Sequence, residues 1–165
     1  MKTNILGGKQ IVVVTGPESS GKTTLVNRLK ADYGMPIVAE FARTYLQQNG
    51  AEYSFEDLEI IGKCQNIQEL EAHNTYPIIV CDTDIVTIDI WAMEVFGKPI
   101  FLPNRNTDVK YYLLCNPDIP WEPGAFRENP NDRERLFRLY YKYLEGRGLS
   151  FEVLKEEGRM SWKPE

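Results

Sequence analysis

The N-terminal part of this chain carries an eight-residue segment whose spacing admits few structures, Gly16-Pro17-Glu18-Ser19-Ser20-Gly21-Lys22-Thr23. It satisfies the pattern G-x-x-x-x-G-K-[ST], follows a strand-like run and opens a helical stretch, which is the context that a phosphate-binding P-loop requires. Glycines let backbone N–H groups turn inward around phosphate oxygens, and the N-terminus of the following helix adds the positive end of its dipole. The segment therefore predicts a nucleoside triphosphate site.

The polar residues of this segment have distinct expected tasks. Lys22 is expected to reach the β- and γ-phosphates, and Thr23 is expected to offer its hydroxyl to Mg²⁺. The other expected phosphate-binding residues are Gly16, Glu18, Ser19, Ser20, Gly21 and Thr24.

Short apolar runs alternate with amphipathic stretches along the whole chain, which is typical of βα units that close into a parallel sheet. The 165 residues, of which 42% are hydrophobic, suffice for one domain with one core, so we expect a single α/β domain over residues 1–165. The runs expected to be strands are Gln10–Thr15, Pro36–Ala39, Pro77–Asp82, Lys110–Cys115 and Ser150–Leu154.

The stretches between these runs predict helices. We expect them over Lys22–Asp32 with a C-cap at Gly34, from Phe41 to about Gly50, from a Ser54/Asp57 capping box to about His73, over Ile85–Phe96, and from an Asn131/Glu134 cap to Gly146. In the long third helix, Ile60, Cys64 and Ile67 are expected to share one stripe. Residues 96–108, broken by Gly97, Pro99 and Pro103, predict a loop or lid-like excursion.

Composition excludes several classes of protein. A net charge of −5 argues against a general nucleic-acid-binding surface, and no apolar run approaches the length of a membrane span. The N-terminus shows no signal-peptide pattern, so we expect a cytoplasmic location. Three separated cysteines and a single histidine, His73, argue against a zinc site or a disulfide framework, and His73 is expected to be solvated or to cap a helix.

Polar residues that follow the strands are candidates for the chemistry, because ligands of an open parallel sheet bind at the carboxyl ends of its strands. Asp82 closes an apolar run in the manner of a carboxylate that holds Mg²⁺ through water. Glu40 could accept the proton of an attacking hydroxyl, with Arg43 one turn on contacting a polar substrate, although an i,i+3 surface pair explains both residues too. For Asp84, helix capping and substrate binding fit equally well.

The segment after the fourth expected strand is held in turns by prolines and contains Trp121. This tryptophan either packs on the hydrophobic core or provides an aromatic surface on which a flat ligand ring stacks. The arginines that follow, on a loop and a helix start, are placed where a lid would bring cations to a transferring phosphoryl group: Arg127, Arg133, Arg135 and Arg138. A solvated helix face explains two of the four equally well. Residues 116–135 are therefore expected to form the lid and substrate region.

Four blocks in the same order, GPESSGKTTL, AEFARTYL, VCDTDIVT, and PDIPW followed by FRENPNDRERLF, resemble the ribosylnicotinamide kinase domain of the NadR type, within the P-loop nucleoside kinases. The resemblance runs from about Ile11 to Leu144. It implies a three-layer α/β/α sandwich of the P-loop NTPase class, with a five-stranded parallel sheet of order 2-3-1-4-5. It also implies ATP and Mg²⁺ as cofactors and nicotinamide riboside as the small-molecule substrate, phosphorylated on its 5′-hydroxyl.

Position by position, the resemblance implies a catalytic role for Lys22, Glu40, Asp82 and the lid arginine Arg127, metal binding by Thr23 and Asp82, and substrate binding by Glu40, Arg43, Asp84 and Trp121. Trp121 would stack on the pyridine ring. Where the family usually reads Trp-Val-Asp-Asp-Gly-Leu-Arg, residues 121–127 read WEPGAFR, so the Asp pair beside the substrate is absent. Gly158-Arg159 would be what remains of a loop that edges the adenine, and a single histidine leaves no H-x-G-H adenylyltransferase site.

Two other functions fit the same residues. One is a nucleotide-dependent switch, in which slow ATP hydrolysis changes a loop such as residues 96–108 and a partner reads the state. The other is a kinase that acts on a different nucleoside.

Overall fold

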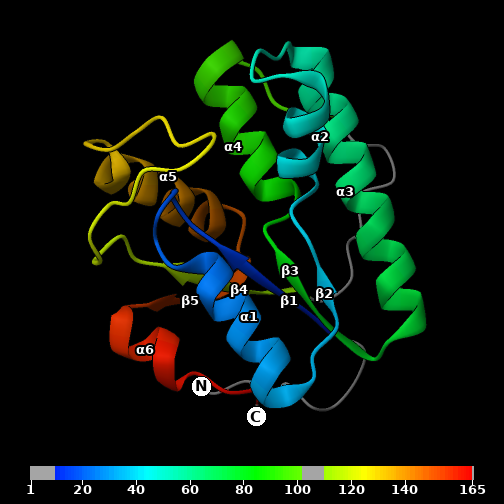
Figure 1. Cartoon of the computed structure of the whole chain (residues 1–165), viewed down its shortest axis with the longest axis vertical. Coiled ribbons are helices and arrows are strands. Elements are labelled where there is room, and N and C mark those ends of the chain that lie inside the picture. The colour runs from blue at the N-terminus through cyan, green and yellow to red at the C-terminus, as the bar shows by residue number, and fades with distance from the viewer. Residues whose placement is uncertain (1–9, 102–109, 165) are drawn as a thin grey trace.

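The computed structural model describes residues 10–101 and 110–164, and these form a central parallel sheet with helices on both faces (Figure 1). The five strands lie in the order β2-β3-β1-β4-β5, so the strand order implied by the family resemblance is confirmed. The strands are β1 (Gln10–Thr15), β2 (Ile37–Val38), β3 (Ile78–Asp82), β4 (Lys110–Cys115) and β5 (Ser150–Leu154). β2 lacks the first and the last residue of its expected run, and β3 lacks the first residue of its run.

The helices complete a three-layer sandwich, because they cover the two faces of the sheet separately. They are α1 (Lys22–Tyr33), α2 (Phe41–Asn49), α3 (Phe55–Thr75), α4 (Ile85–Phe96), α5 (Arg133–Gly146) and α6 (Glu156–Ser161). Val13 and Ile79 of the sheet pack in one cluster with Tyr140 of α5, together with residues of α4. Val12 and its neighbours pack in a second cluster with Leu29 and other residues of α1.

The register of β1 and β3 places the C-terminal ends of these two strands side by side. In the parallel β1/β3 pair, Val14 is the partner of Asp82, so β1 runs out into the Gly16–Thr23 loop directly beside the last residue of β3. All residues from Ile11 to Thr15 are buried, which explains why β1 is a continuous apolar run with no alternation. This edge of the sheet is where polar residues from different parts of the chain can converge.

Helix ends follow the local signals of the sequence. Gly34 and Gly97 end α1 and α4 with left-handed backbone, and each donates its N–H to a carbonyl of the last turn. The Ser54/Asp57 capping box is present at the start of α3, as the spacing predicts. At α5 the prediction was wrong by one residue: the N-cap is Asp132 rather than Asn131, and the Asp132 carboxylate binds the Arg135 guanidinium.

The apolar stripe predicted on α3 is not the buried face of the helix. Ile60 and Ile67 are 44% and 52% exposed, and Cys64 is only partly buried. The buried face instead carries Leu58 and Ile61 together with polar residues: Gln65, Asn66, Glu69 and His73. The expectation that His73 is solvated was wrong for the same reason, since α3 packs against the sheet as far as its last turn.

Residues 102–109 of the expected 96–108 excursion lie outside the described part of the chain. In the part that is described, Ile100 is buried and its N–H donates to Asp89 Oδ1 at 2.9 Å. Among the described helices, none is long and apolar enough to cross a membrane.

Candidate active site

The loop between β1 and α1 has the backbone geometry that its glycines predict. Gly16 has φ +134°, and a Cβ at this position would lie 2.7 Å from the carbonyl oxygen of Cys115, so only glycine fits beside β4. Ser20 closes the turn, because its hydroxyl donates to Pro17 O at 2.7 Å. Lys22 folds back over the loop, and its Nζ donates to Gly16 O at 3.0 Å and to Pro17 O at 2.7 Å. The lysine ammonium therefore lies inside the cradle of the loop.

The end of β3 lies against the start of α1. Thr23 Oγ1 and Asp82 Oδ2 are 3.4 Å apart, and Asp82 is 8% exposed. The next residue, Thr83, has left-handed backbone with φ +66° and donates its N–H to Val14 O at 2.9 Å, which fixes the turn after β3. The second oxygen of Asp82, Oδ1, is buried and has no hydrogen-bond partner among the described residues. This oxygen is free to accept from water or from a hydrated ion.

Glu40 occupies the N-cap position of α2, where its side chain makes no capping hydrogen bond and instead lines the same cavity as the loop. Its carboxylate pairs with Arg43 at 3.5 Å, so the surface pair considered from the sequence is formed, but Glu40 also lies within electrostatic reach of Lys22 and Asp82. Burial raises the pKa of Glu40 above its ordinary value, and Lys22 offsets part of this rise while Asp82 adds to it. Burial likewise raises the pKa of Asp82, against the opposing charges of Lys22 and Arg43.

The segment between β4 and α5 is docked on the loop through backbone groups. Glu18 accepts from the backbone N–H groups of Glu128, at 3.0 Å, and of Asn129. Ser19 Oγ accepts from the backbone N–H of Glu122 at 2.9 Å and lies 3.5 Å from a guanidinium nitrogen of Arg127. Glu18 and Ser19 are predicted to bind phosphate; in this structure their side chains bind the segment of residues 122–129.

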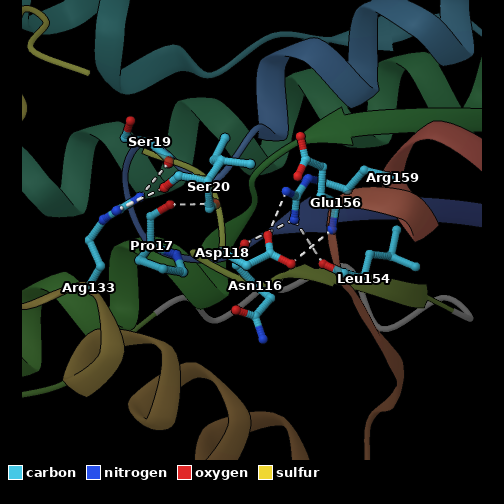
Figure 2. Close-up of polar contacts among 10 residues, drawn as sticks. Pro17, Ser19, Ser20, Asn116, Asp118, Arg133, Leu154, Glu156 and Arg159 are labelled. Carbon is cyan, nitrogen blue, oxygen red and sulfur yellow. Dashed lines mark hydrogen bonds and ion pairs between the residues drawn. The ribbon is translucent and has the colours of Figure 1, made fainter. Parts of the chain in front are cut away.

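Two further arginines bind the start of the segment that follows β4, as Figure 2 shows. Arg133, at the start of α5, donates to Ser19 O at 2.8 Å and to Ile119 O at 3.0 Å. Arg159 is 6% exposed and donates to Asp118 Oδ1 at 2.7 Å and to the carbonyl of Asn116 at 2.9 Å. Arg159 lies in α6 rather than in a loop, so the expectation of a loop remnant at Gly158-Arg159 was wrong.

A cavity of about 560 Å³ opens above the loop. Its lining includes every residue from Gly16 to Thr24, together with Glu40, Arg43 and Arg127. These predicted site residues come from the loop between β1 and α1, from the starts of α1 and α2, and from the segment before α5, and the fold gathers them around one space. Asp82 lies just beneath this lining, against Thr23.

Asp84 is not part of the cavity lining, and its carboxylate is fully occupied elsewhere. It is 0% exposed; Oδ1 accepts from Val86 N–H at 3.0 Å and caps α4, while Oδ2 accepts from Lys110 Nζ at 2.9 Å and from the Tyr112 hydroxyl at 2.8 Å. Lys110 Nζ also pairs with Glu69 at 2.7 Å. The structure thus favours the capping interpretation of Asp84 over the expected substrate contact.

Trp121 also lies outside the cavity lining. It is half-buried, and its indole Nε1 is buried without a hydrogen-bond partner among the described residues. Its neighbours Ile119 and Glu122 do line the cavity, so the segment passes the site although Trp121 is not part of the lining. The structure therefore gives no support to the expected stacking role of Trp121.

Sequence reasoning missed the wall of the cavity that α4 and its neighbours form. That wall includes Tyr53, Thr87, Trp91, Glu94 and Tyr140. Burial raises the pKa of the Tyr140 hydroxyl, which bonds Thr87. A signal was available, because positions 83, 87, 90–91 and 94–95 recur at helical spacing and define one face of α4. The uniform apolar character of α4 hid this face.

Within the described residues, no group of three or more histidine, cysteine or acidic side chains is arranged to hold a metal ion. Mg²⁺ bound mainly by phosphate oxygens needs few protein ligands, and the Thr23 hydroxyl with the Asp82 carboxylate provides a hydroxyl and a hard anionic oxygen of the kind it prefers. The unpartnered Asp82 Oδ1 fits the same use.

Comparisons with known proteins agree with this arrangement. The chain is 26% identical over 157 residues to the trifunctional NAD biosynthesis/regulator protein NadR of Escherichia coli, a match that covers 88% of this chain and 38% of that protein. The chain therefore spans about two fifths of the length of this relative.

Two solved structures share the fold. A crystal structure of NadR in complex with NAD and AMP-PNP matches 94% of this chain and 46% of that chain, with a TM-score of 0.67 at 22% identity. A structure of NadR in complex with NR matches 91% of this chain and 45% of that chain, with a TM-score of 0.67 at 24% identity. The predicted resemblance to the NadR-type domain is confirmed by these matches. A family model described as an AAA domain matches residues 11–161, nearly the whole chain, and the protein belongs to this AAA domain family.

Proposed function

We propose that this chain is an ATP-dependent nucleoside kinase that transfers the γ-phosphoryl group to the 5′-hydroxyl of nicotinamide riboside and so forms nicotinamide mononucleotide. One observation carries the proposal: a single cavity of about 560 Å³ contains both the phosphate loop and a carboxylate, Glu40, with space beyond it along α4 for an acceptor. The name of the relative as a NAD biosynthesis protein and the NR bound in a solved NadR structure support this choice of acceptor.

The proposal treats residues 1–165 as one kinase unit with residues 116–135 as its lid. It concerns the kinase activity only, since the chain spans 38% of a relative whose name gives three functions. We place the activity in the cytoplasm, because ATP is supplied there, and the partner is a small nucleoside.

Lys22 and the loop backbone are proposed to bind the triphosphate. In the structure Lys22 Nζ is satisfied by two carbonyls of its own loop, and phosphate oxygens are stronger acceptors for an ammonium than neutral carbonyls. Thr23 and Asp82 would hold Mg²⁺, which when bound neutralises phosphate charge. Arg127, held against Ser19 at the rim of the same loop, would then face the transferring group.

Glu40 is proposed as the base that takes the proton of the acceptor hydroxyl. It lines the cavity, and burial raises its pKa towards the range in which a carboxylate accepts a proton more readily. Asp82 is the other candidate, but it lies under the lining against Thr23 and is therefore assigned to the metal. Arg43 stays paired with Glu40 and can contact the ribose side of the substrate.

The direct test is a purified protein with Mg-ATP and a panel of nucleosides, including nicotinamide riboside and deoxyguanosine, scored for ADP release. We expect release that depends on nicotinamide riboside and a product that is nicotinamide mononucleotide. Slow release indifferent to every nucleoside would favour the nucleotide switch instead. Release that depends on another nucleoside would keep the kinase and change its acceptor.

Replacing Glu40 by glutamine should lower kcat by roughly 10²- to 10⁴-fold, because a general base contributes about that much. The wild-type rate should rise with pH through the raised pKa of Glu40, since only the deprotonated carboxylate can accept the proton, and it should fall as the pH is lowered through that pKa. The measurement is kcat as a function of pH for both proteins. We expect the variant to lack this rise.

The matched control is Gln47→Ala, an exposed position on the same helix, which should leave the pH profile unchanged. If Glu40→Gln keeps its turnover and its pH profile while Asp82→Asn loses both, the base is Asp82 and the assignment to Glu40 is wrong.

A further inference from the structure

We propose that Trp91, oriented by Tyr53, is the aromatic plate on which the base of the acceptor nucleoside stacks, in place of the lid tryptophan Trp121. This inference rests on the proposed function for the identity of the acceptor. It concerns which side chain determines the specificity of the acceptor end of the cavity.

Position along α4 is the first argument. The face of α4 that lines the cavity begins beside the phosphate loop at Thr83 and continues through Thr87 to Trp91. Trp91 is seven residues beyond the N-cap Asp84, about 10 Å further along the axis at the rise of an α-helix. A nucleoside whose 5′-hydroxyl lies beside Glu40 and whose base points along α4 therefore brings its ring to the level of Trp91.

The second argument is that the indole of Trp91 is held in one orientation before any ligand arrives. Its Nε1 donates to the Tyr53 hydroxyl at 2.7 Å. The two rings meet edge to face, with centroids 4.7 Å apart and planes inclined by 72°, and Tyr53 is itself braced by Phe96 at 6.2 Å. Both Trp91 and Tyr53 line the cavity, so this pair offers an aromatic surface there. Because the indole is already held in place, a ligand that stacks on it loses little side-chain conformational entropy.

The indole face of Trp91 suits a positively charged ring, and a carboxylate lies one turn away. Glu94, one turn beyond Trp91, binds the Arg135 guanidinium at 2.7 Å, and Asp132 binds the same guanidinium at 2.7 Å. The two carboxylates share this cation, and Arg138 also lies within electrostatic reach of Asp132. An indole face attracts a cationic ring such as the pyridinium of nicotinamide riboside by a cation–π interaction.

Trp121 offers none of these features. It does not line the cavity, and its indole N–H is buried without a partner among the described residues, so it has no group that orients it toward a ligand. We therefore expect Trp91 to stack on the base of the acceptor and Trp121 not to, so substitutions at the two positions serve as controls for each other.

The first experiment measures binding without catalysis. The chain has three tryptophans, Trp91, Trp121 and Trp162, and a pyridinium ring stacked on an indole quenches its fluorescence. Nicotinamide riboside should quench the wild type, Trp121→Phe and Trp162→Phe, and should quench Trp91→Phe far less. Quenching that survives in Trp91→Phe but disappears in Trp121→Phe overturns the proposal, as does an unquenched wild type.

The second experiment separates stacking from structural support. Trp91→Leu should raise KM for nicotinamide riboside by roughly 10- to 100-fold, the usual effect of losing one base–aromatic stack, with little change in KM for ATP. Trp91→Phe keeps a flat ring and should restore KM to within a few-fold of wild type. Trp121→Leu should change KM less than Trp91→Leu does, and the reverse order overturns the proposal. A wild type that is quenched yet phosphorylates no nucleoside contradicts the proposed function and leaves the stacking site standing.

Discussion

Lys22→Ala is expected to reduce phosphoryl transfer by roughly 10³-fold or more, the scale of losing a charged donor that stabilises a transferring phosphoryl group. Lys22 Nζ lies within the loop, bound to the carbonyls of Gly16 and Pro17, and its side chain lines the cavity. The other described cations of the lining have partners elsewhere: Arg43 pairs with Glu40, Arg135 with Glu94, and Arg127 contacts Ser19 and Glu122. The measurement is the rate of ADP formation with Mg-ATP and nicotinamide riboside at saturating concentrations.

The loop should survive this substitution. The turn at Ser20 and the contacts of Arg133 with Ser19 O and Ile119 O do not involve the lysine. Thermal unfolding should therefore stay close to that of the wild type. Lys30→Ala, at an exposed position in the last turn of α1, is the matched control and should keep full activity. Near-normal turnover in Lys22→Ala would remove this residue from the proposed chemistry.

Lys110→Met is expected to destabilise the fold by about 3–5 kcal/mol, because it breaks a buried ionic cluster by removing one partner. The Lys110 side chain is 7% exposed and neutralises two carboxylates, Glu69 at 2.7 Å and Asp84 at 2.9 Å, whose side chains are 1% and 0% exposed. These carboxylates raise the pKa of Lys110 well above its ordinary value against the opposing effect of burial, so the amine stays charged. In a protein of this size the loss corresponds to a fall in Tm of roughly 6–20 °C.

The pH dependence of this variant gives a second readout. Without the lysine, the two buried carboxylates are left charged with no cation beside them, and protonation removes that penalty. The destabilisation should consequently shrink as the pH is lowered and grow as it is raised. Lys63→Met, exposed on α3, should change stability by less than about 0.5 kcal/mol. An unchanged Tm in Lys110→Met would show that the cluster is replaceable by apolar packing.

The sheet and the phosphate loop could be predicted from the sequence because their signals are local. A run such as Gln10–Thr15 must be a buried strand, and the glycines that follow it are required by positive φ angles and by the close approach of β4. The placement of Glu40 and Asp82 near the loop followed from a topological rule, that the carboxyl ends of parallel strands share one edge.

The errors arose where distant residues decide the outcome. The buried face of α3 carries two polar residues with distant partners. The side-chain oxygen of Gln65 accepts from Phe41 N–H, and Glu69 pairs with Lys110 of β4. Helical spacing shows which residues share a face, but the polar face could be buried only because these remote partners exist. Likewise, the indole of Trp91 in the cavity wall is held by a hydrogen bond to Tyr53, a contact between residues 38 positions apart that helical spacing does not reveal.

The way Glu18 fastens the lid has a consequence for how this protein can change in evolution. Its carboxylate binds main-chain N–H groups of residues 128 and 129, so almost any side chains at those two positions preserve the docking. Proline is the exception, because it has no N–H to donate. The side chains at residues 128 and 129 can therefore change, proline excepted, while the Glu18 carboxylate keeps this segment docked on the loop between β1 and α1.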